Sequence, residues 1–383
     1  MSTPHTSTSR APGPAAATTA ARPAQPNVVL SVHDLNTTFA AGSRTSNVVR
    51  GVSFDLRRGQ TLMLLGESGS GKSVTARSIM RLYGRNATIT GSVRLSGQEL
   101  LDLSADRMRG VRGARIALVP QDPTGSLDPL RRIGAQITEV LALHNVERLR
   151  RAGRRQAEEL LRLVGINDPK RVADSYPHEL SGGMRQRAVI AIAVSCDPEV
   201  LIADEPTTAL DVTVQKQILE LFADLQDRLG MATLMVTHDV GVAAEAGDRV
   251  GVMYAGRLVE EGPAAQVFAS PRHPYTAGLL AALPSPGVPR GTLRSIPGSP
   301  PPAGAFPAGC AFAPRCPVAR DSCRTDDPPL VAVAPDRSVA CPVVNPASPS
   351  APPSTPTAGA VDIPSPAAPP ADQPSALSKG GPR

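Results

Sequence analysis

One glycine-rich run constrains this chain more than any other stretch. It reads Gly66-Glu67-Ser68-Gly69-Ser70-Gly71-Lys72-Ser73 and lies between the apolar run Thr61–Leu65 and residues 74–82, whose pattern predicts a helix. Glycines let the backbone close around a phosphate, and the free N–H groups at a helix start attract its charge. Lys72 can then reach the β- and γ-phosphates, and the Ser73 hydroxyl can ligate Mg²⁺. A Gly/Ser-rich turn is the simpler alternative, but the predicted strand and helix favour a nucleotide site.

Composition limits what surrounds this run. The chain has 383 residues, 40 of them proline, and many prolines fall in residues 1–27 and 345–383. We predict that both ends are disordered, because they contain little that can be buried. No apolar run approaches the roughly 20 residues that span a bilayer, and the N-terminus lacks the apolar core of a signal peptide. These features predict a soluble, cytosolic protein.

The net charge of +6 comes from arginines spread over much of the chain. Such a charge suits either nucleic acid or the anionic face of a membrane. Aromatic residues make up 3% of the sequence, and no basic patch is interleaved with them. This weakens the nucleic-acid interpretation, because proteins of that kind commonly stack bases on aromatic side chains.

Four polar residues are candidates because each stands after a predicted strand. Gln121 follows a strand predicted over residues 115–119, where a plain turn residue is the simpler interpretation. Asp204 and Glu205 end the apolar run 199–203, where an Asp can hold Mg²⁺ through water and a Glu can activate a water. An acid pair that only caps the strand is the alternative. His238 follows the strand Ala232–Thr237, and a structural histidine is as good an interpretation as a catalytic one.

Two other features also allow plain alternatives. Phe39, upstream of the glycine-rich run, could pack in a core or stack on an adenine. The run Ser181-Gly182-Gly183 precedes an apolar helix, where its N–H groups could hold an anion or where Ser181 could simply cap the helix. Between them, residues from about 122 to 185 have helical periodicity and indicate a helical subdomain inserted into an α/β core.

Taken in order, these motifs resemble those of the ATP-binding subunit of ABC transporters, over about residues 28–285. The resemblance implies an α/β fold: a P-loop NTPase nucleotide-binding domain with an antiparallel β subdomain. It also implies an inserted helical subdomain at about residues 122–185 and a small C-terminal cysteine-containing extension at residues 286–344. ATP and Mg²⁺ are the implied cofactors, and ATP hydrolysis is the implied activity.

The family's functional residues transfer position by position. Glu205 corresponds to the catalytic glutamate, His238 to the switch histidine, Gln121 to the Q-loop glutamine and Lys72 to the Walker A lysine; these four are the implied catalytic residues. The implied Mg²⁺ ligands are Ser73, Gln121 and Asp204. The residues implied to contact nucleotide are Phe39, Gly66, Glu67, Ser68, Gly69, Ser70, Gly71, Lys72, Ser73, Val74, Gln121, Ser181, Gly182, Gly183, Asp204 and Asp211.

The resemblance also implies partners. In this family, Ser181, Gly182 and Gly183 bind the γ-phosphate of a nucleotide that a second ATP-binding subunit holds, so a homodimer or a heterodimer is expected. Two transmembrane permease subunits are implied, together with an extracytoplasmic peptide-binding protein reached through the complex. The expected location is the cytoplasmic face of the cell membrane, where the subunit is peripheral, and nucleic acid is not an implied partner.

The C-terminal part narrows the branch. His273-Pro274-Tyr275-Thr276 and the cysteine-bearing segment after it, over about residues 270–343, resemble dipeptide and oligopeptide importers. Four thiolates suit tetrahedral zinc or a four-iron cluster, and they could also simply pack; spacing does not decide between these. The resemblance favours a [4Fe–4S] cluster, whereas Cys196 lies apart and is expected to be a buried packing residue. The four cysteines of the extension are Cys310, Cys316, Cys323 and Cys341.

The resulting prediction is the ATP-hydrolysing subunit of an ABC importer for dipeptides or oligopeptides. An importer of nickel or of another small solute is one alternative. A non-transport ABC ATPase acting on nucleic acid is another, but the chain has a single set of motifs and no heptads.

Overall fold

The computed structural model describes residues 27–344, apart from residues 43, 145–152, 209 and 284–294. The two predicted disordered tails, 1–27 and 345–383, therefore lie outside the described residues, except for Asn27. The predicted boundary between residues 285 and 286 lies outside them as well.

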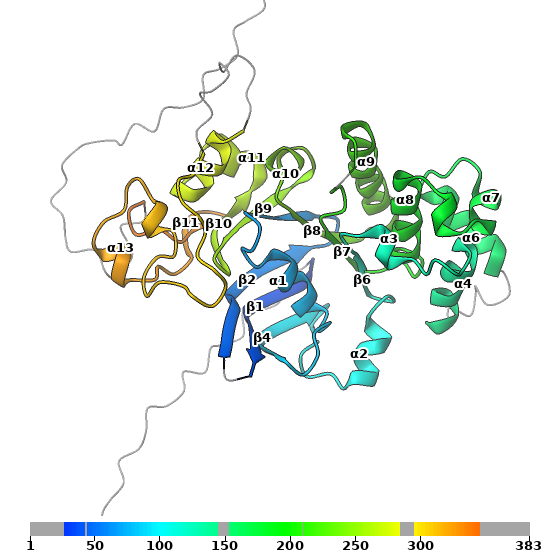
Figure 1. Ribbon diagram of the computed structural model, residues 1–383, viewed down its shortest axis with the longest axis horizontal. Helices are drawn as coiled ribbons and strands as arrows, with labels where there is room; N and C mark the ends of the chain where they lie inside the picture. Colours follow the sequence, from blue (N-terminus) through cyan, green and yellow to red (C-terminus); the bar gives the residue numbers. More distant parts are fainter. Residues whose placement is uncertain (1–26, 43, 145–152, 209, 284–294, 345–383) are drawn as a thin grey trace, which may run out of the picture.

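Within the described residues, eight strands form a central sheet in the order β11-β12-β10-β9-β3-β8-β7-β6 (Figure 1). The strands from β9 to β6 are parallel, and the others are antiparallel. Every residue of β3, β7 and β8 is buried, as expected for parallel strands that are covered on both faces. The bounds are β3 (Thr61–Leu65), β6 (Ile116–Val119), β7 (Val200–Asp204), β8 (Ala232–Thr237), β9 (Arg249–Tyr254), β10 (Arg257–Pro263), β11 (Val331–Ala334) and β12 (Arg337–Val339).

Side chains that alternate along the strands build a core on each face of this sheet. Leu62 and Leu64 of β3 pack into the core that the sheet shares with the second, smaller sheet. Met63 and Leu65 pack into the core on the opposite face, under the helices. Successive residues of a strand point to opposite faces, so one apolar run can support both cores.

The smaller sheet is antiparallel and has, among the described residues, four strands in the order β2-β1-β4-β5. Helix α1 packs between it and the central sheet. The strand predicted from residue 28 runs on to Ala41, which places Phe39 within β1, opposite Ser46. The elements here are β1 (Val28–Ala41), β2 (Arg44–Arg57), α1 (Lys72–Ile79), β4 (Ala87–Leu95), β5 (Gln98–Glu99) and α2 (Ala105–Val111).

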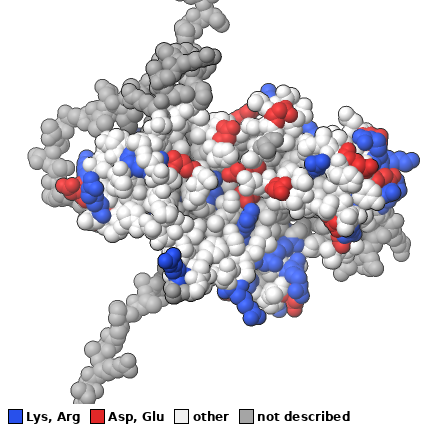
Figure 2. Space-filling model, viewed as in Figure 1, with Lys and Arg blue, Asp and Glu red and all other residues white. Residues whose placement is uncertain are grey.

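A group of helices between β6 and β7 forms one end of the molecule (Figure 1). Acidic and basic side chains lie close together on this end (Figure 2), where Arg155 pairs with Glu159 at 3.1 Å and Arg154 with Glu158 at 3.3 Å. Exposed pairs of this kind stabilise a helix only slightly. The helices are α3 (Pro123–Ser126), α4 (Ile133–Leu143), α6 (Gly153–Leu163), α7 (Pro169–Asp174), η1 (Pro177–Glu179) and α8 (Gly182–Ala193).

The cysteine-bearing extension lies at the opposite end and continues the central sheet (Figure 1). Its strand β12 pairs with β10 through Glu260 and Val339, so the extension is part of the sheet and not a separate module. None of the described helices is both long and apolar enough to cross a membrane. The remaining helices are α9 (Val212–Leu229), α10 (Val240–Ala246), α11 (Ala264–Ala269), α12 (Pro274–Ala281), η2 (Ala313–Arg315) and α13 (Ser322–Thr325).

Candidate functional site

The glycine-rich run connects the carboxyl end of β3 to the start of α1. Gly71 stands at the N-cap of α1 with a φ of 100°, a left-handed value that glycine adopts without strain. A Cβ added at Gly66 would lie 2.2 Å from the carbonyl oxygen of Met253 in β9. With Gly71 as its N-cap, helix α1 begins at Lys72, two residues earlier than the pattern of residues 74–82 predicts. The loop has the form of an anion-binding turn before a helix N-terminus.

The side chain of Lys72 closes back over this loop. Its Nζ donates to the carbonyl oxygens of Gly66 at 2.7 Å and Glu67 at 3.0 Å, and the residue is 4% exposed. Burial lowers the pKa of Lys72, while the carboxylates of Glu205, Asp204 and Glu67 oppose that shift. A cationic group thus faces the inside of the loop, where a phosphate would be received.

Ser73 and Asp204 are 131 positions apart in the sequence and lie side by side in the fold. The Ser73 hydroxyl donates to Oδ1 of Asp204 at 2.6 Å, and Asp204 is 1% exposed at the end of β7. A side-chain nitrogen of Arg77 lies 3.5 Å from the other carboxylate oxygen. A hydroxyl and a carboxylate are the oxygen ligands that Mg²⁺ prefers, so these two residues fit a Mg²⁺ site.

Glu205 is the centre of a second group of side chains. The Nε2 amide of Gln121 donates to Oε2 at 2.9 Å, and Nδ1 of His238 lies 3.2 Å from Oε1. The hydroxyl of Thr208 donates to Oε2 at 3.0 Å. Gln121, Glu205 and His238 follow β6, β7 and β8 respectively, so the parallel sheet brings three predicted residues to one edge.

The backbone fixes the position of Glu205. Its φ is 50°, a left-handed value that is rare for a residue with a Cβ, and its N–H donates to the carbonyl of Val236 at 2.9 Å. Strained backbone of this kind persists where surrounding contacts impose it, and it is concentrated at functional sites. Gln121 was also an expected Mg²⁺ ligand, but its amide nitrogen is engaged with Glu205; its role as a ligand stays a prediction.

Phe39 is half-buried at the end of β1 and lies against Tyr83. The two ring centroids are 4.9 Å apart and the rings are almost perpendicular. Phe39 is therefore not a fully buried core residue. Core packing, one of its two predicted roles, accounts for the contact with Tyr83 but not for the exposed part of the ring. Tyr83 follows α1, and burial raises the pKa of its phenol. Sequence reasoning missed Tyr83, because no motif contains it.

The remaining predicted positions cap helices away from the loop. Ser181 is the N-cap of α8, and its hydroxyl accepts from the N–H of Met184 at 3.4 Å. Asp211 is the N-cap of α9 and accepts from the N–H of Val214 at 3.0 Å. Across the described part of the chain, no hydrogen bond or ion pair joins them, Gly182 or Gly183 to the glycine-rich loop. Both caps are exposed and open to a further contact.

The four cysteines of the extension come to one region. The N–H of Cys310 donates to the carbonyl of Cys323 at 2.9 Å. Burial raises the pKa of the Cys310 thiol, the neighbouring thiols of Cys341 and Cys323 contribute to the rise, and the resulting pKa is about 11. Burial also raises the pKa values of Cys316 and Cys341, and both have Cys323 as a neighbour.

These thiols are free, and they do not yet form a metal site. In residues 27–344, with the gaps given above, no group of three or more His, Cys, Asp or Glu side chains is arranged closely enough to hold a metal ion. Thiols are nevertheless the donor type that a thiophilic metal prefers, although the described side chains are not arranged to hold one. Cys196 is half-buried and not fully buried as expected, and it packs against the core under the helices.

A glycine-rich turn before a helix N-terminus, a hydroxyl–carboxylate pair suited to Mg²⁺ and a hydrogen-bonded glutamate at the edge of a parallel sheet are the features of a nucleotide-hydrolysing cassette. The comparisons agree with this class. The model of the family described as "ABC transporter" matches residues 49–208, and that of "Oligopeptide/dipeptide transporter, C-terminal region" matches residues 259–323. The chain belongs to the ABC transporter family of ATP-binding proteins and is an ATPase that uses ATP and Mg²⁺.

Its curated relatives are similar over most of the chain. The probable peptide ABC transporter ATP-binding protein y4tR of Sinorhizobium fredii is 48% identical over 319 residues, which cover 82% of this chain and 95% of that protein. A putative peptide import ATP-binding protein of Brucella abortus is 48% identical over 82% of this chain and 94% of its own length. The oligopeptide transport ATP-binding protein OppD of Mycobacterium tuberculosis is 47% identical over 82% of this chain, but the match spans only 51% of it.

Solved structures share the fold. A dimeric, post-hydrolysis structure of the ATP-binding cassette MJ0796, bound to ADP and Pi, superposes with a TM-score of 0.54 at 28% identity. The superposition covers 61% of this chain and 98% of the MJ0796 chain. The structure of cbiO1 from Clostridium perfringens, part of the transporter complex cbiONQ, also gives a TM-score of 0.54, at 26% identity over 64% of this chain and 92% of its own. The predicted family and fold class are thereby confirmed.

Proposed function

We propose that this chain is the ATP-hydrolysing subunit of an importer of dipeptides or oligopeptides. The observation that carries the cargo assignment is the match of residues 259–323 to the C-terminal region of oligopeptide and dipeptide transporters. The names of the relatives, which are peptide import or oligopeptide transport proteins, support it. The subunit would sit at the cytoplasmic face of the membrane and drive two permease subunits, which receive peptide from an extracytoplasmic binding protein.

The proposed chemistry assigns separate tasks to two groups of residues. The amides of the loop Gly66–Gly71 and the ammonium of Lys72 bind the β- and γ-phosphates, with Glu67 and Val74 beside them. Ser73 and Asp204 would hold Mg²⁺, which neutralises charge between the phosphates when it is bound. Phe39 would stack on the adenine. None of these groups reacts covalently, so the site works by positioning and by charge.

Glu205 acts on the attacking water. Its carboxylate already accepts from Gln121 and Thr208 on one oxygen, and the other faces His238, so its orientation is fixed before substrate binds. A carboxylate held in this way can accept a proton from a water aimed at the γ-phosphate. His238 is more than half exposed, which leaves it free to reach the γ-phosphate end. Gln121 lies between β6 and the helices that follow it. It would couple the presence of the γ-phosphate to movement of these helices, which would contact the permease.

The second half of each nucleotide site would come from a partner subunit. Ser181, Gly182 and Gly183 lie at the exposed N-terminus of α8, which has the N–H groups to receive the γ-phosphate of the partner's nucleotide. Asp211 caps α9 beside the same surface, since Gly183 lies close to Val214 of α9. We therefore propose an ATP-dependent dimer with this chain or with a related subunit.

The four cysteines of the extension would hold a [4Fe–4S] cluster, for which a Cys₄ donor set is the usual ligand set. The cluster would cross-link the extension, and no step of ATP hydrolysis depends on it. The test is iron and acid-labile sulfide analysis of protein purified without oxygen, with about four of each expected per chain. Protein that contains zinc and no sulfide would replace the cluster by a zinc site. Protein without iron or zinc would leave four packing cysteines.

The cargo is tested by uptake in cells that depend on this subunit. We expect cells with Lys72→Ala to lose accumulation of a labelled dipeptide and to keep that of nickel. Lys216→Ala, a lysine change on α9 outside the described site, serves as the matched control and should transport normally. Loss of nickel uptake with peptide uptake intact would contradict the peptide assignment.

A further inference from the structure

A residue of the C-terminal extension reaches the phosphate-binding loop from 248 positions further along the chain. Arg315 ends η2, and its guanidinium donates to both carboxylate oxygens of Glu67, at 2.7 Å and 3.0 Å. The Arg315 side chain is 6% exposed and that of Glu67 is 26% exposed. A bidentate contact between arginine and carboxylate fixes the orientation of the two side chains as well as their distance. Glu67 is the second residue of the loop, so this contact acts on the loop itself.

The same residue of the loop is held at two other atoms. The N–H of Glu67 donates to the hydroxyl of Tyr275 at 2.9 Å, and its carbonyl accepts from Nζ of Lys72 at 3.0 Å. Tyr275 belongs to α12 and to the His-Pro-Tyr-Thr motif. The sequence alone assigns no structural role to this tyrosine. The extension and α12 thus hold Glu67 from one side, while the loop's own lysine holds it from the other.

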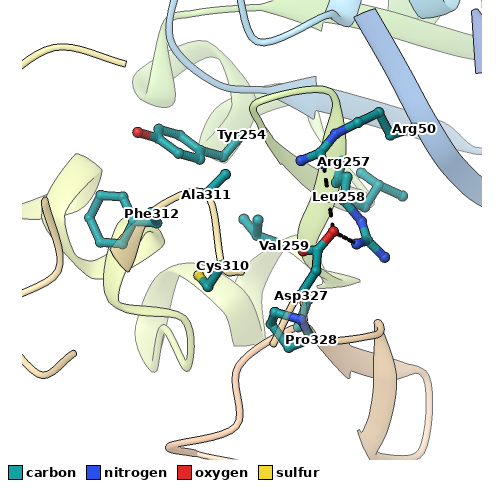
Figure 3. A pocket seen from close by; sticks show the side chains of 11 residues that line it. Arg50, Tyr254, Arg257, Leu258, Val259, Cys310, Ala311, Phe312, Asp327 and Pro328 are labelled. Carbon is teal, nitrogen blue, oxygen red and sulfur yellow. Dashed lines mark hydrogen bonds and ion pairs between the residues drawn. The ribbon is translucent and has the colours of Figure 1, made fainter. Parts of the chain in front are cut away.

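The guanidinium of Arg315 is itself firmly placed. Its Nε donates to the carbonyl of Pro297 at 2.9 Å, and one Nη donates to the hydroxyl of Tyr254 at 3.3 Å. The rings of Tyr254, Tyr275 and Phe312 pack against one another with centroids 4.6 to 5.4 Å apart. Figure 3 shows Tyr254 and Phe312 side by side, next to the small cavity of about 20 Å³ that also involves Cys310. An arginine held by the Glu67 carboxylate, the Pro297 carbonyl and the Tyr254 hydroxyl is a rigid support for the loop.

We propose that Arg315 is a positioning residue for nucleotide binding, which makes the affinity of the loop for ATP depend on the C-terminal extension. Glu67 places a negative charge at the loop that receives the triphosphate, and Arg315 both neutralises that charge and turns it away. Without Arg315, the free carboxylate would repel the phosphates and the loop would lose one of its supports. This inference rests on the assignment of residues 66–73 as the phosphate-binding loop.

The variants Arg315→Gln, Glu67→Gln and the double variant test it in the full-length protein, with ATP affinity and kcat measured separately. We expect Arg315→Gln to weaken ATP binding about tenfold, a typical size for coupling between two sites, with kcat at saturation changed less. Glu67→Gln should restore most of the affinity in the double variant, because the repelling charge is then gone. A support without an electrostatic role would show no such rescue.

Asp327→Asn is the matched control. Asp327 also ties the extension to the rest of the protein, through Arg50 at 3.6 Å and through Arg257 (Figure 3), but it does not touch the loop. We expect this variant to lower the melting temperature and to bind ATP within about twofold of the wild type. If it loses as much affinity as Arg315→Gln, the effect is general loosening of the extension and the proposal is wrong.

Two further measurements keep the outcome decisive. Should Arg315→Gln fail to fold, Arg315→Lys gives the same test with an expected loss of about threefold, because an ammonium cannot make the two-pronged contact. A folded Arg315 variant that binds ATP within twofold of the wild type would overturn the proposal. Wild-type protein that binds no ATP would instead overturn the assignment of the loop, so the two failures are distinguishable.

Discussion

Glu205→Gln should separate nucleotide binding from hydrolysis. The glutamine has the shape of the glutamate, and its carbonyl oxygen can replace Oε2 as the acceptor for Gln121 and Thr208. Its amide group then faces Nδ1 of His238 and can donate to it. The surrounding hydrogen bonds are kept, but the side chain can no longer accept a proton from water.

The size of the expected effect follows from these contacts. Loss of a positioned general base lowers the rate about 10² to 10⁴-fold, or roughly 3 to 5 kcal/mol in the activation free energy. The effect on folding should stay below about 1 kcal/mol, because no buried group loses its partner. Removal of a negative charge close to Lys72 also favours a bound triphosphate, so ATP affinity should hold or rise.

Phosphate release, ATP binding and thermal melting measure the three quantities. Glu199→Gln is a matched control: it precedes β7 at the opposite end from Glu205 and pairs with Arg115 and Ser96. We expect the control to hydrolyse ATP at the wild-type rate with a slightly lower melting temperature. Turnover of Glu205→Gln within a few-fold of the wild type would refute the role of Glu205 as the base. ATP-dependent dimerisation should persist in this variant.

Two predictions concern other parts of the chain. Phe39→Ala should weaken ATP binding by roughly 1 to 3 kcal/mol and leave inorganic tripolyphosphate binding unchanged, because only the stacking on the base is lost; equal losses for both ligands would argue against stacking. His273 is fully buried, and burial lowers its pKa from 6.5 to about 3. The unfolded chain therefore binds a proton that the folded chain does not, so unfolding free energy should fall by about 2 kcal/mol between pH 7 and pH 5. His273→Asn, which keeps an acceptor for the N–H of Tyr275, should remove that part of the slope in denaturant titrations; an unchanged slope would contradict the assignment.

The candidate site and the extension lie at different edges of one sheet. The glycine-rich loop, Gln121, Glu205 and His238 follow the carboxyl ends of β3, β6, β7 and β8. At the other side of β3, β9 and β10 carry the extension, whose Arg315 returns to the loop. Parallel strands bring residues from distant parts of the chain to one edge of the sheet, within hydrogen-bonding distance of one another.

Local chemistry made much of this predictable from the sequence. The spacing of Gly66, Gly71, Lys72 and Ser73 reflects what a backbone needs in order to close around a phosphate, and that need does not depend on the rest of the fold. The apolar run Thr61–Leu65 likewise predicts a strand, and the structure buries every residue of it. Fold class and family therefore followed from short stretches taken in order, and the assignment of the nucleotide loop stays a prediction.

Only the tertiary structure decided which distant residues meet. No local pattern distinguishes Arg315 from the other arginines of the chain, and Tyr83 and Thr208 belong to no motif, yet these side chains contact Glu67, Phe39 and Glu205. Their partners are fixed by strand order, since β12 joins the sheet at β10 and thereby brings the extension close to the loop. Sequence spacing determines what a segment can do by itself, whereas the pairing of strands determines what it is held against, because long-range contacts depend on the whole fold and not on the neighbouring residues.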